Sequence, residues 1–558
     1  MKFEKIQSKD ITKNPILNGV LAFNGYDKSI LSRLEPKKID LKFDDVKVES
    51  FVKYVDKWRQ SQRIVVNCCD YDGDGDTSGA AMTKFLQREG VNVVTKCLSR
   101  KHGFGLFKET IDEIIADYGK EAIGGIVTVD NGSKSNEVIK YAKSLIKDLD
   151  VIVTDHHDKN EGIEDIVELF INPHYDNSIT NENICGMMVV LVLVKQYYVK
   201  KGTLSQNKTF MAELIELAGV ASVTDVMPVF DENRTAIKFF IDHVNNEKVI
   251  NLGLRTLIEK ANINPKSFTA DDIGFKVGPM LNACGRLTTS ETPTGLLLST
   301  TKDEAVNLSR ECIETNKERQ DMTKALKDAL VIEDRPVKVM TYDNAHEGLI
   351  GIIAGNLEEE TGSPSFVFTK CEKGYKGSGR SPINYNLIKG ATEVFKAHPE
   401  IVVAFGGHPG AMGLTLKDLD SVKKFNEYMD ENYLKSGCEA LSVKYINYPN
   451  MPIEDVYKGL EEFEPFGEGF AKPNYKVVGI ASNVKIISEK HMGWILKVKN
   501  YADETKPIII KMNWFKHVED TVNLEGLIEV YFTVSKSSVG NNIFYSGNVI
   551  YAQKYQKK

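Results

Sequence analysis

Short apolar runs typical of β-strands alternate with amphipathic helical segments between about residues 60 and 230. The candidate strands are rich in Val, Ile and Thr; they are RIVVNCC (63–69), NVVTKCLS (92–99), GGIVTVD (124–130) and DVIVTD (150–155). Apolar residues recur at helical spacing in the segments between them, 79–90, 107–119 and 133–148. This alternation predicts an α/β fold with a doubly wound parallel sheet, in which ligands bind beyond the carboxyl ends of the strands.

Acidic residues and histidines follow these candidate strands. Four aspartates occupy alternate positions directly after the first strand: Asp70, Asp72, Asp74 and Asp76. The same residue types end the later elements: Asp130, Asp155, His156, His157 and Asp225. Residues i and i+2 lie on the same side of an extended segment, so the four clustered carboxylates would repel one another unless a cation lies close. Taken singly, a strand-end aspartate is more often a helix cap than a ligand, and only their joint occurrence predicts a metal site.

The type of cation follows from the spacing. An EF-hand calcium loop opens with the same D-x-D-x-D-G pattern. Counted from Asp70, Gly75 is in place, but the twelfth position is Ala81 instead of glutamate, and a strand precedes the loop. Calcium is therefore excluded. Carboxylates with one or two imidazoles suit two Mn²⁺ or Mg²⁺ ions, which at roughly 3.5–4 Å apart bind a phosphoryl group and lower the pKa of a bridging water.

The length of 558 residues is too great for one hydrophobic core, so we expect several domains. Residues 230 to 330 are charged and helical and include one long amphipathic segment, after which a βα pattern resumes from residue 336. Short strands separated by turns follow a Gly/Pro-containing linker and predict a small barrel. The predicted division is a catalytic domain with an N-terminal extension, a helical connector, a second smaller α/β domain, and a linker with a β-barrel: 1–230, 231–334, 335–450 and 451–558.

The predicted barrel is basic although the whole chain has a net charge of -7. From Asn474 to Lys558 there are 12 Lys and no Arg against 7 acidic residues. Aromatic residues interleave with these lysines: Trp494, Tyr501, Trp514, Phe515, Tyr531, Phe532, Phe544 and Tyr545. We expect half of them to fill the barrel core and the others to stack on bases, each contributing about 1–3 kcal/mol. The barrel is therefore predicted to follow a single-stranded nucleic acid.

Several other classes of protein are excluded by composition. The eight cysteines form no CxxC pair, which argues against a disulfide framework and a structural zinc site. The N-terminus lacks the apolar segment of a signal peptide. The longest apolar run, residues 187–194, is too short to span a bilayer and predicts a buried helix. We therefore expect a cytoplasmic protein without membrane association.

The motifs together resemble a known family. DYDGDGDTSGAA, VDNG, DHH and VTDVMP are similar to the four motifs of the DHH phosphoesterase superfamily. GPMLNACGRL (278–287), GSGRS (377–381), AFGGHPGAMGLTL and FEPFGEGFAKP are similar to its RecJ branch, which consists of single-strand-specific 5′→3′ DNA exonucleases. The resemblance runs in order from about residue 60 to 475. It implies a DHHA1-like second domain, an OB-fold for the barrel, and an enzyme of DNA recombination and repair.

The resemblance also implies roles for single residues. The metal ligands would be Asp72, Asp74, Asp130, His156 and Asp225, with Asp70 and His157 in the same catalytic site as ligands or as their supports. Ser378 and Arg380, with Arg100, would bind the terminal 5′-phosphate, and Gly377 and Gly379 would let it approach the backbone closely. The cleft would be lined by Arg286 and His408, which would touch substrate phosphates. Cys68 replaces a histidine frequent in the family, and we expect it to be a bystander.

The expected partners are two Mn²⁺ or Mg²⁺ ions, single-stranded DNA, and a single-strand-binding protein or helicase, with the enzyme itself a monomer. Two other functions stay open at this stage. One is a DHH phosphodiesterase acting on short oligonucleotides or cyclic dinucleotides, which usually lacks a basic barrel. The other is a non-catalytic DNA-binding scaffold, in which several of the candidate ligands would be expected to be lost.

Overall fold

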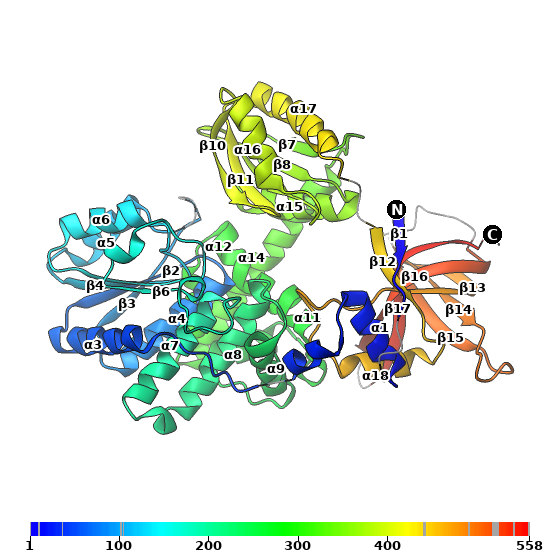
Figure 1. Ribbon diagram of the computed structural model, residues 1–558, viewed down its shortest axis with the longest axis horizontal. Coiled ribbons are helices and arrows are strands. Elements are labelled where there is room, and N and C mark those ends of the chain that lie inside the picture. The colour runs from blue at the N-terminus through cyan, green and yellow to red at the C-terminus, as the bar shows by residue number, and fades with distance from the viewer. Residues whose placement is uncertain are drawn as a thin grey trace. The chain divides into compact units, whose positions relative to one another are not determined.

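The structure is a computed structural model (Figure 1), and it describes residues 2–8, 12–35, 37–100, 103, 105–438, 442–488, 491–515, 524–539 and 542–555. The chain divides into two compact units. The larger unit comprises Ile39–Asp225 and Phe239–Leu441, and the barrel unit comprises Met1–Lys38, Val226–Lys238 and Ser442–Lys558. The first 38 residues thus lie with the barrel, whereas the predicted division groups them with the catalytic domain. The four-domain division stays a prediction.

The first sheet of the larger unit is parallel, with the strand order β3-β2-β4-β5-β6. Its strands are β2 (Ile64–Cys69), β3 (Val93–Cys97), β4 (Ile123–Val129), β5 (Asp150–Thr154) and β6 (Leu169–Ile171). The helices around it are α3 (Asp45–Ser61), α4 (Gly73–Arg88), α5 (Lys108–Tyr118), α6 (Asn136–Leu145) and α7 (Gly186–Lys200). Figure 1 shows α5 and α6 on one face of the sheet and α3 and α7 on the other, which confirms the doubly wound α/β fold.

The strand order reverses at β2, because β3 lies on one side of it and β4 on the other. In doubly wound sheets this reversal opens a crevice at the carboxyl ends of the strands, where ligands bind. Asp70 follows β2 and Asp130 follows β4. The fold therefore places the candidate acidic residues where such a sheet binds its ligand.

One local expectation is wrong. The four aspartates after β2 do not form an extended segment, because α4 already begins at Gly73. The carboxylate of Asp72 is its N-cap and accepts the N–H groups of Asp74 and Gly75, both at 3.2 Å. A helix start carries unpaired N–H groups and a partial positive charge, so it tolerates acidic residues in its first turn. Part of the crowding is thereby explained without a cation.

The helical connector is confirmed as a helical region. After α8 (Lys208–Thr224) of the preceding segment, its elements are α9 (Asp231–Asn245), α10 (Leu252–Lys260), α11 (Ala270–Asp272), a π-helical turn (Ile273–Val277), α12 (Gly278–Leu287), α13 (Glu291–Leu298) and α14 (Lys302–Asp328). The expected long amphipathic segment is α14, with 27 residues. The apolar run at 187–194 lies within α7, and all eight of its residues are buried.

A second, smaller α/β sheet follows in the same unit, with the strand order β10-β11-β9-β8-β7. Its elements are β7 (Lys338–Tyr342), α15 (Glu347–Thr361), β8 (Ser365–Cys371), β9 (Gly374–Arg380), α16 (Leu387–Ala397), β10 (Val402–His408), β11 (Ala411–Leu416) and α17 (Leu419–Lys435). Only β7 and β8 pair in parallel; the other neighbours are antiparallel. The GSGR segment is thus part of a central strand.

The expected reason for the glycines of that segment is also wrong. A Cβ added to Gly377 would lie 2.3 Å from the Phe368 ring, and one added to Gly379 would lie 2.5 Å from the Phe366 ring. These glycines therefore make room for two buried aromatic rings instead of a phosphate. Because successive strand residues point to opposite faces, Ser378 and Arg380 face the other side of the sheet.

The barrel unit contains a closed five-stranded barrel, consistent with the expected OB-fold. Its strands are β13 (Tyr475–Ser488), β14 (His491–Val498), β15 (Ile508–Phe515), β16 (Gly526–Val539) and β17 (Asn542–Lys554), and β16 pairs back to β13. Two shorter strands extend the sheet, β1 (Lys2–Lys5) and β12 (Ser442–Asn447), and this unit also holds α1 (Pro15–Asn24), α2 (Leu31–Leu34) and α18 (Ile453–Glu461).

The aromatic residues of the barrel divide as expected between its core and its surface. Four are buried: Trp494, Trp514, Tyr531 and Phe532. Tyr501, Phe515 and Phe544 are exposed by 73%, 48% and 44%, and Tyr545 is half-buried. All eight cysteines are free thiols. Within the described ranges, no helix combines the length and the apolar character needed to cross a membrane.

Candidate active site

The candidate metal ligands come from five places in the larger unit. Asp70 and Asp72 lie in the turn after β2, Asp74 lies in the first turn of α4, and Asp225 ends α8. Asp130 follows β4, and His156 and His157 follow Asp155, the first residue after β5. Ligand atoms within 4.8 Å of one another form three overlapping groups: Asp130, His156 and His157; Asp74, His156 and Asp225; and Asp70, Asp72 and Asp130. The fold thus brings all seven predicted catalytic residues together.

His156 lies at the centre of this cluster. Its Nε2 is 3.1 Å from Oδ1 of Asp130, 3.4 Å from Oδ2 of Asp225 and 3.7 Å from Oδ2 of Asp74. Three carboxylates therefore point at one imidazole nitrogen. Such an arrangement of oxygen and nitrogen donors around one point is that of a divalent cation site.

Several buried oxygen and nitrogen atoms of the cluster, which could bind a metal, lack a hydrogen-bond partner within the described part of the chain. They are Oδ1 of Asp70, Oδ1 of Asp130, Nε2 of His156 and Oδ2 of Asp225. Buried polar groups are normally hydrogen-bonded, and exceptions indicate a missing ion or a functional role. The donors are carboxylate oxygens and an imidazole nitrogen, which suit Mn²⁺ or Mg²⁺. The residues present therefore fit a divalent cation.

Burial and mutual repulsion act on the carboxylates. Burial, followed by the charge of Asp72, raises the pKa of Asp74 to about 6. Burial also raises the pKa of Asp70, Asp130 and Asp225 well above their usual range, and the neighbouring carboxylates raise it further. A cation would favour the ionised forms of all four. Without one, the ionised cluster is destabilising.

The two histidines differ in their surroundings. Burial lowers the pKa of His156 to about 3, so its imidazole is neutral and can donate a lone pair to a metal. Burial acts in the same direction on His157, but its hydrogen bond to Asp155 and the charge of that carboxylate prevail and raise the pKa of His157 to about 9. The two neighbours in sequence therefore hold different protonation states in the metal-free cluster.

Hydrogen bonds from the backbone hold the carboxylates in place. Asp74 accepts the N–H groups of Gly186 at 2.6 Å and of Met187 at 2.8 Å, at the start of α7. Asp155 is fully buried and accepts the N–H of Ser133 at 2.9 Å. It also accepts the N–H of His156 at 2.7 Å and contacts Nδ1 of His157 at 2.8 Å.

The sequence pattern placed Asp155 among the metal-type ligands, but Asp155 is not in the three ligand groups and instead orients both histidines. The sequence pattern also gave no role to Asn282 in the NACGR motif, whose Oδ1 accepts the N–H of Gly73 at 2.6 Å and so supports the start of α4. The contact of Asn282 with Gly73 joins two distant segments, which a single sequence does not reveal.

Two polar residues near β2 lie outside the cluster. Asp76 is fully buried, and its Oδ1 accepts the hydroxyl of Thr294 at 2.7 Å. It is not a member of the ligand groups, since the helical turn carries its side chain away from them. Cys68 is fully buried in the apolar core, where burial raises the pKa of its thiol to about 12. It is a core residue, as expected.

The predicted phosphate-binding residues also converge. The guanidinium of Arg100 lies 4.3 Å from the centre of the Tyr71 ring, and Arg380 donates to Oγ of Ser378 at 3.2 Å. Burial, together with the positive charges of Arg100, Arg319 and Arg380, lowers the pKa of Arg286 to about 10. Four arginines thus lie close enough to repel one another, which predicts an anion between them. Arg319, on α14, was missed because a charged residue on a long solvent-facing helix carries no signal in sequence.

A pocket lies between the first sheet and the start of α15. Its cavity volume is about 620 Å³, and its lining includes Tyr71, Arg100, Arg286 and Gly348. Arg286 also donates to the carbonyl of Gly348 at 3.4 Å. His408 ends β10, and burial together with the charges of Arg380 and His157 lowers its pKa. The structure therefore brings His408 near both the arginines and the histidines of the metal cluster.

Comparison with known proteins agrees with this arrangement. Residues 63–220 match the model of the DHH family, N-terminal domain, and residues 334–434 match the model of the DHHA1 domain. The chain carries a DHH and a DHHA1 domain. The candidate metal ligands Asp70 to His157 lie in the DHH domain, and Ser378, Arg380 and His408 lie in the DHHA1 domain, so the expected resemblance is confirmed.

Two curated relatives match most of the chain. The single-stranded-DNA-specific exonuclease RecJ of Salmonella typhimurium is 28% identical over 463 residues, which cover 78% of this chain and 78% of that protein. RecJ of Escherichia coli matches with the same identity and coverage. The crystal structure of RecJ from Thermus thermophilus in complex with Mn²⁺ superposes with a TM-score of 0.80 at 19% identity, covering 100% of this chain and 80% of that one. At this identity the superposition shows a common fold, including the barrel.

Proposed function

We propose that this protein is a metal-dependent exonuclease that hydrolyses single-stranded DNA from the 5′ end to 5′-mononucleotides, in DNA recombination and repair. The observation that carries the proposal is the pairing of two clusters in one unit. One cluster has carboxylate oxygens and one imidazole nitrogen without hydrogen-bond partners among the described residues, and the other has four arginines that repel one another. Such a site attracts cations on one side and phosphate on the other. A relative that is named a single-stranded-DNA-specific exonuclease matches 78% of this chain and supports the same reaction.

The metal would be held by Asp72, Asp74, Asp130, His156 and Asp225. When bound, two Mn²⁺ or Mg²⁺ ions would stabilise charge on a phosphoryl group and lower the pKa of a water molecule. The protein contributes fixed ligand positions, because Asp74 is held by the start of α7 and the histidine turn by Asp155. Ligands held in this way need little reorganisation when substrate binds.

The substrate phosphates would be bound by the arginines. Arg380 and Ser378, which contact each other at 3.2 Å, would bind a terminal 5′-phosphate together with Arg100. An arginine fork meets phosphate oxygens two at a time, so this pocket would fix which end of a strand enters. Arg286 and His408 would contact the next phosphates, and the exposed aromatic residues of the barrel would stack on bases further along.

The two other functions differ from this proposal in what they bind and cut. A phosphodiesterase for short oligonucleotides or cyclic dinucleotides would gain little from a basic barrel with exposed aromatic residues. A non-catalytic scaffold would not need a complete set of ligand donors. The domain division at 1–230, 231–334, 335–450 and 451–558, a cytoplasmic location, a monomeric state and a single-strand-binding or helicase partner belong to the same proposal.

A degradation assay on strands labelled at either end tests the proposal. With Mn²⁺ we expect the 5′ label to appear at once as a mononucleotide, while strands labelled at the 3′ end shorten gradually. A metal chelator should stop the degradation of both labelled strands, and duplex DNA should resist degradation. Asp225→Asn is the matched variant, since it keeps the shape of a ligand and removes its charge. Shortening from the 3′ end, full activity in chelator, or rapid cutting of dinucleotides alone would overturn the proposal.

A further inference from the structure

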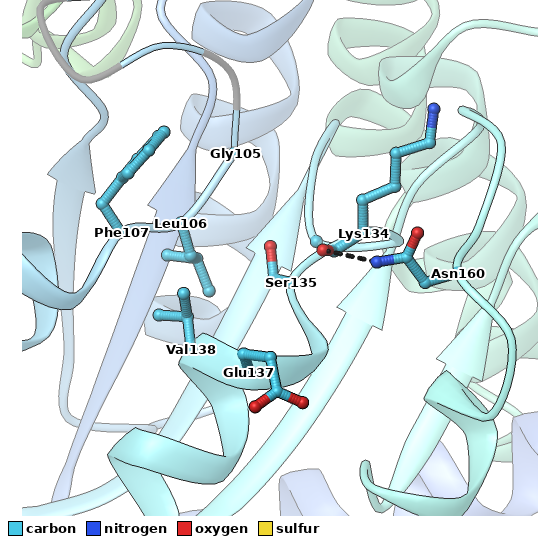
Figure 2. Close-up of a pocket in the computed structure, with 9 residues that line it drawn as sticks. Gly105, Leu106, Phe107, Lys134, Ser135, Glu137, Val138 and Asn160 are labelled. Carbon is cyan, nitrogen blue, oxygen red and sulfur yellow. Dashed lines mark hydrogen bonds between the residues drawn. The ribbon is translucent and has the colours of Figure 1, made fainter. Parts of the chain in front are cut away.

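A smaller pocket in the larger unit is not used by the site described above (Figure 2). Its cavity volume is about 240 Å³. The lining residues are Gly105, Leu106, Phe107, Gly132, Lys134, Ser135, Glu137, Val138 and Asn160. Pockets for drug-sized ligands range from about 300 to 1,000 Å³, so this one suits a smaller group. Its chemistry indicates which group.

The polar side of the pocket is positive. The ten-residue helix α6 starts here at Asn136, and no side-chain hydrogen bond caps it among the described residues. The first-turn N–H groups of a helix lack intrahelical partners and carry a partial positive charge, so they bind anions when these are available. The exposed amine of Lys134 lies at the rim of the same pocket. Both features favour an anion.

Ser135 points to the same conclusion independently. It is the N-cap residue of α6 and only 7% exposed, yet its hydroxyl does not cap the helix. The described part of the chain offers this hydroxyl no hydrogen-bond partner. Figure 2 shows it directed into the space between Phe107 and Lys134. A buried hydroxyl normally finds a partner, and here the partner would come from a ligand in the pocket.

The only acidic side chain of the lining does not fill this position. Glu137 is paired with Lys140 at 2.8 Å on the outer face of the helix, and Figure 2 shows its carboxylate directed away from the Ser135 hydroxyl. The opposite wall consists of Leu106, Phe107 and Val138. An anion bound at the helix start could therefore pack the CH groups of an attached deoxyribose against this wall.

The pocket is built from the same two loops as the metal cluster. The loop after β4 begins with Asp130 and continues to Lys134 and Ser135, and the loop after β5 leads from His157 to Asn160. Asn160 joins the two loops, since its side chain donates to the carbonyl of Lys134 at 3.0 Å and its N–H donates to the carbonyl of Ser133 at 2.9 Å. A ligand in the pocket would thus lie a few residues from the candidate metal ligands.

We propose that this pocket binds a phosphate group of the nucleic acid, through Lys134, Ser135 and the start of α6. It is a second phosphate site, distinct from the arginine cluster, and the inference rests on the proposed function. The phosphate belongs either to the bound strand or to the released mononucleotide. Both present the same chemistry to the pocket, and the experiment separates them.

Two variants and a control test the pocket in the full-length protein. Lys134→Ala removes the rim charge, and Lys120→Ala, which removes an exposed lysine outside the pocket, is the matched control. Ser135→Asp is the sharper variant, because the partial positive charge at the start of a helix favours an acidic side chain, but the carboxylate places a negative charge where the phosphate would bind. It should raise the stability of the protein and still weaken phosphate binding, a combination that a purely structural Ser135 would not produce.

Binding is measured in chelator, so that no hydrolysis occurs, by fluorescence anisotropy of a labelled 12-nucleotide single strand and by calorimetry with thymidine 5′-monophosphate. If the strand supplies the phosphate, Lys134→Ala should weaken strand binding about three- to tenfold and lower the slope of log K against log salt by about 0.7, the value for one phosphate contact on a single strand. Ser135→Asp should weaken it further, and Lys120→Ala should change neither quantity.

If the released nucleotide is the ligand, the same two variants should weaken monophosphate binding and leave strand binding unchanged. Wild-type affinity of both variants for both ligands would overturn the inference. Failure of the proposed function is distinguishable, because it would appear in the wild-type protein as a lack of metal-dependent hydrolysis. If only the inference about the pocket is wrong, the wild-type protein still shows metal-dependent hydrolysis.

Discussion

Replacing Asp130 by asparagine should stabilise the metal-free protein and remove its response to Mn²⁺. Asp130 is 2% exposed, and its Oδ1 has no hydrogen-bond partner in the described residues. Burial and the charges of Asp74 and Asp72 raise its pKa. Its backbone has a φ of 60°, in the left-handed region that asparagine tolerates better than most residues. Asp130→Asn therefore removes the charge and keeps the shape and the backbone.

The magnitude follows from Asp74, whose pKa is raised from 3.8 to about 6. At about 1.36 kcal/mol per unit, one such carboxylate lowers the free energy of unfolding by roughly 3 kcal/mol when ionised. Asp130 experiences the same burial and repulsion, so its neutralisation should return about 1–3 kcal/mol at pH 8. Because a raised pKa means that stability is lost as the pH increases above the usual range of a carboxyl group, the difference from wild type should be small at pH 4.5 and larger at pH 8.

Hydrogen exchange in chelator is the suitable measurement, because a chain with two compact units need not unfold in one step. Amides of β2 and β4 should exchange more slowly in Asp130→Asn than in wild type at pH 8. Mn²⁺ at about 100 times its dissociation constant should then add about 2.7 kcal/mol to the wild type and much less to the variant. Faster exchange in the variant, or an unchanged Mn²⁺ effect, would refute the reasoning.

Three further outcomes are expected. Asp155→Asn should destabilise the DHH domain by about 2–4 kcal/mol, since it breaks a buried charge pair. NMR titration of the metal-free variant should also show that the pKa of His157 falls from about 9 towards its usual value. Arg380→Ala should reduce the preference for 5′-phosphorylated over 5′-hydroxyl strands by roughly 1.5–3 kcal/mol, whereas Lys376→Ala on the same strand should not. Replacing Phe515 and Phe544 by alanine should weaken strand binding by about 1–3 kcal/mol per stacked base at unchanged thermal stability, whereas Trp494→Ala, in the barrel core, should lower the stability.

The parallel sheet could be predicted because its strands are buried on both faces and therefore appear as continuous runs of Val, Ile and Thr. The metal cluster followed from the sheet, since the ends of parallel strands meet at one edge. The start of α4 was misjudged because the cap formed by Asp72 is a local hydrogen bond that competes with the alternating pattern. The same error placed Asp74 and Asp76 side by side, whereas the helix directs Asp76 towards Thr294.

Other features depend on contacts that a single sequence does not contain. Gly377 and Gly379 are typical of a tight turn, and only the rings of Phe368 and Phe366 explain why they occur within a strand. Arg319 joins the other arginines only because α14 lies against α12 and α15. The pairing of β1 with β12 joins the first and the last segment of the barrel unit across more than 400 residues, a distance over which no pattern is visible.

Metal binding itself should depend on pH, and the direction follows from the pKa shifts. A carboxylate ligand must be ionised to bind a cation, so protons compete with the metal. Asp74 has a pKa of about 6, and burial also raises the pKa of Asp70, Asp130 and Asp225. Mn²⁺ should therefore bind weakly at pH 5 and more tightly as the pH increases through about 6.

The affinity for Mn²⁺ should increase about tenfold per pH unit for each proton that the metal displaces. Above pH 5 the imidazole of His156 should not limit binding, because burial lowers its pKa to about 3. Calorimetric titration with Mn²⁺ at pH 5, 6 and 7.5, each in two buffers of different ionisation enthalpy, measures both the affinity and the number of protons released. A constant affinity over this range, with no proton release at pH 5, would contradict the cluster as the metal site. Asp130→Asn serves as the control, since it should release fewer protons and bind more weakly at every pH.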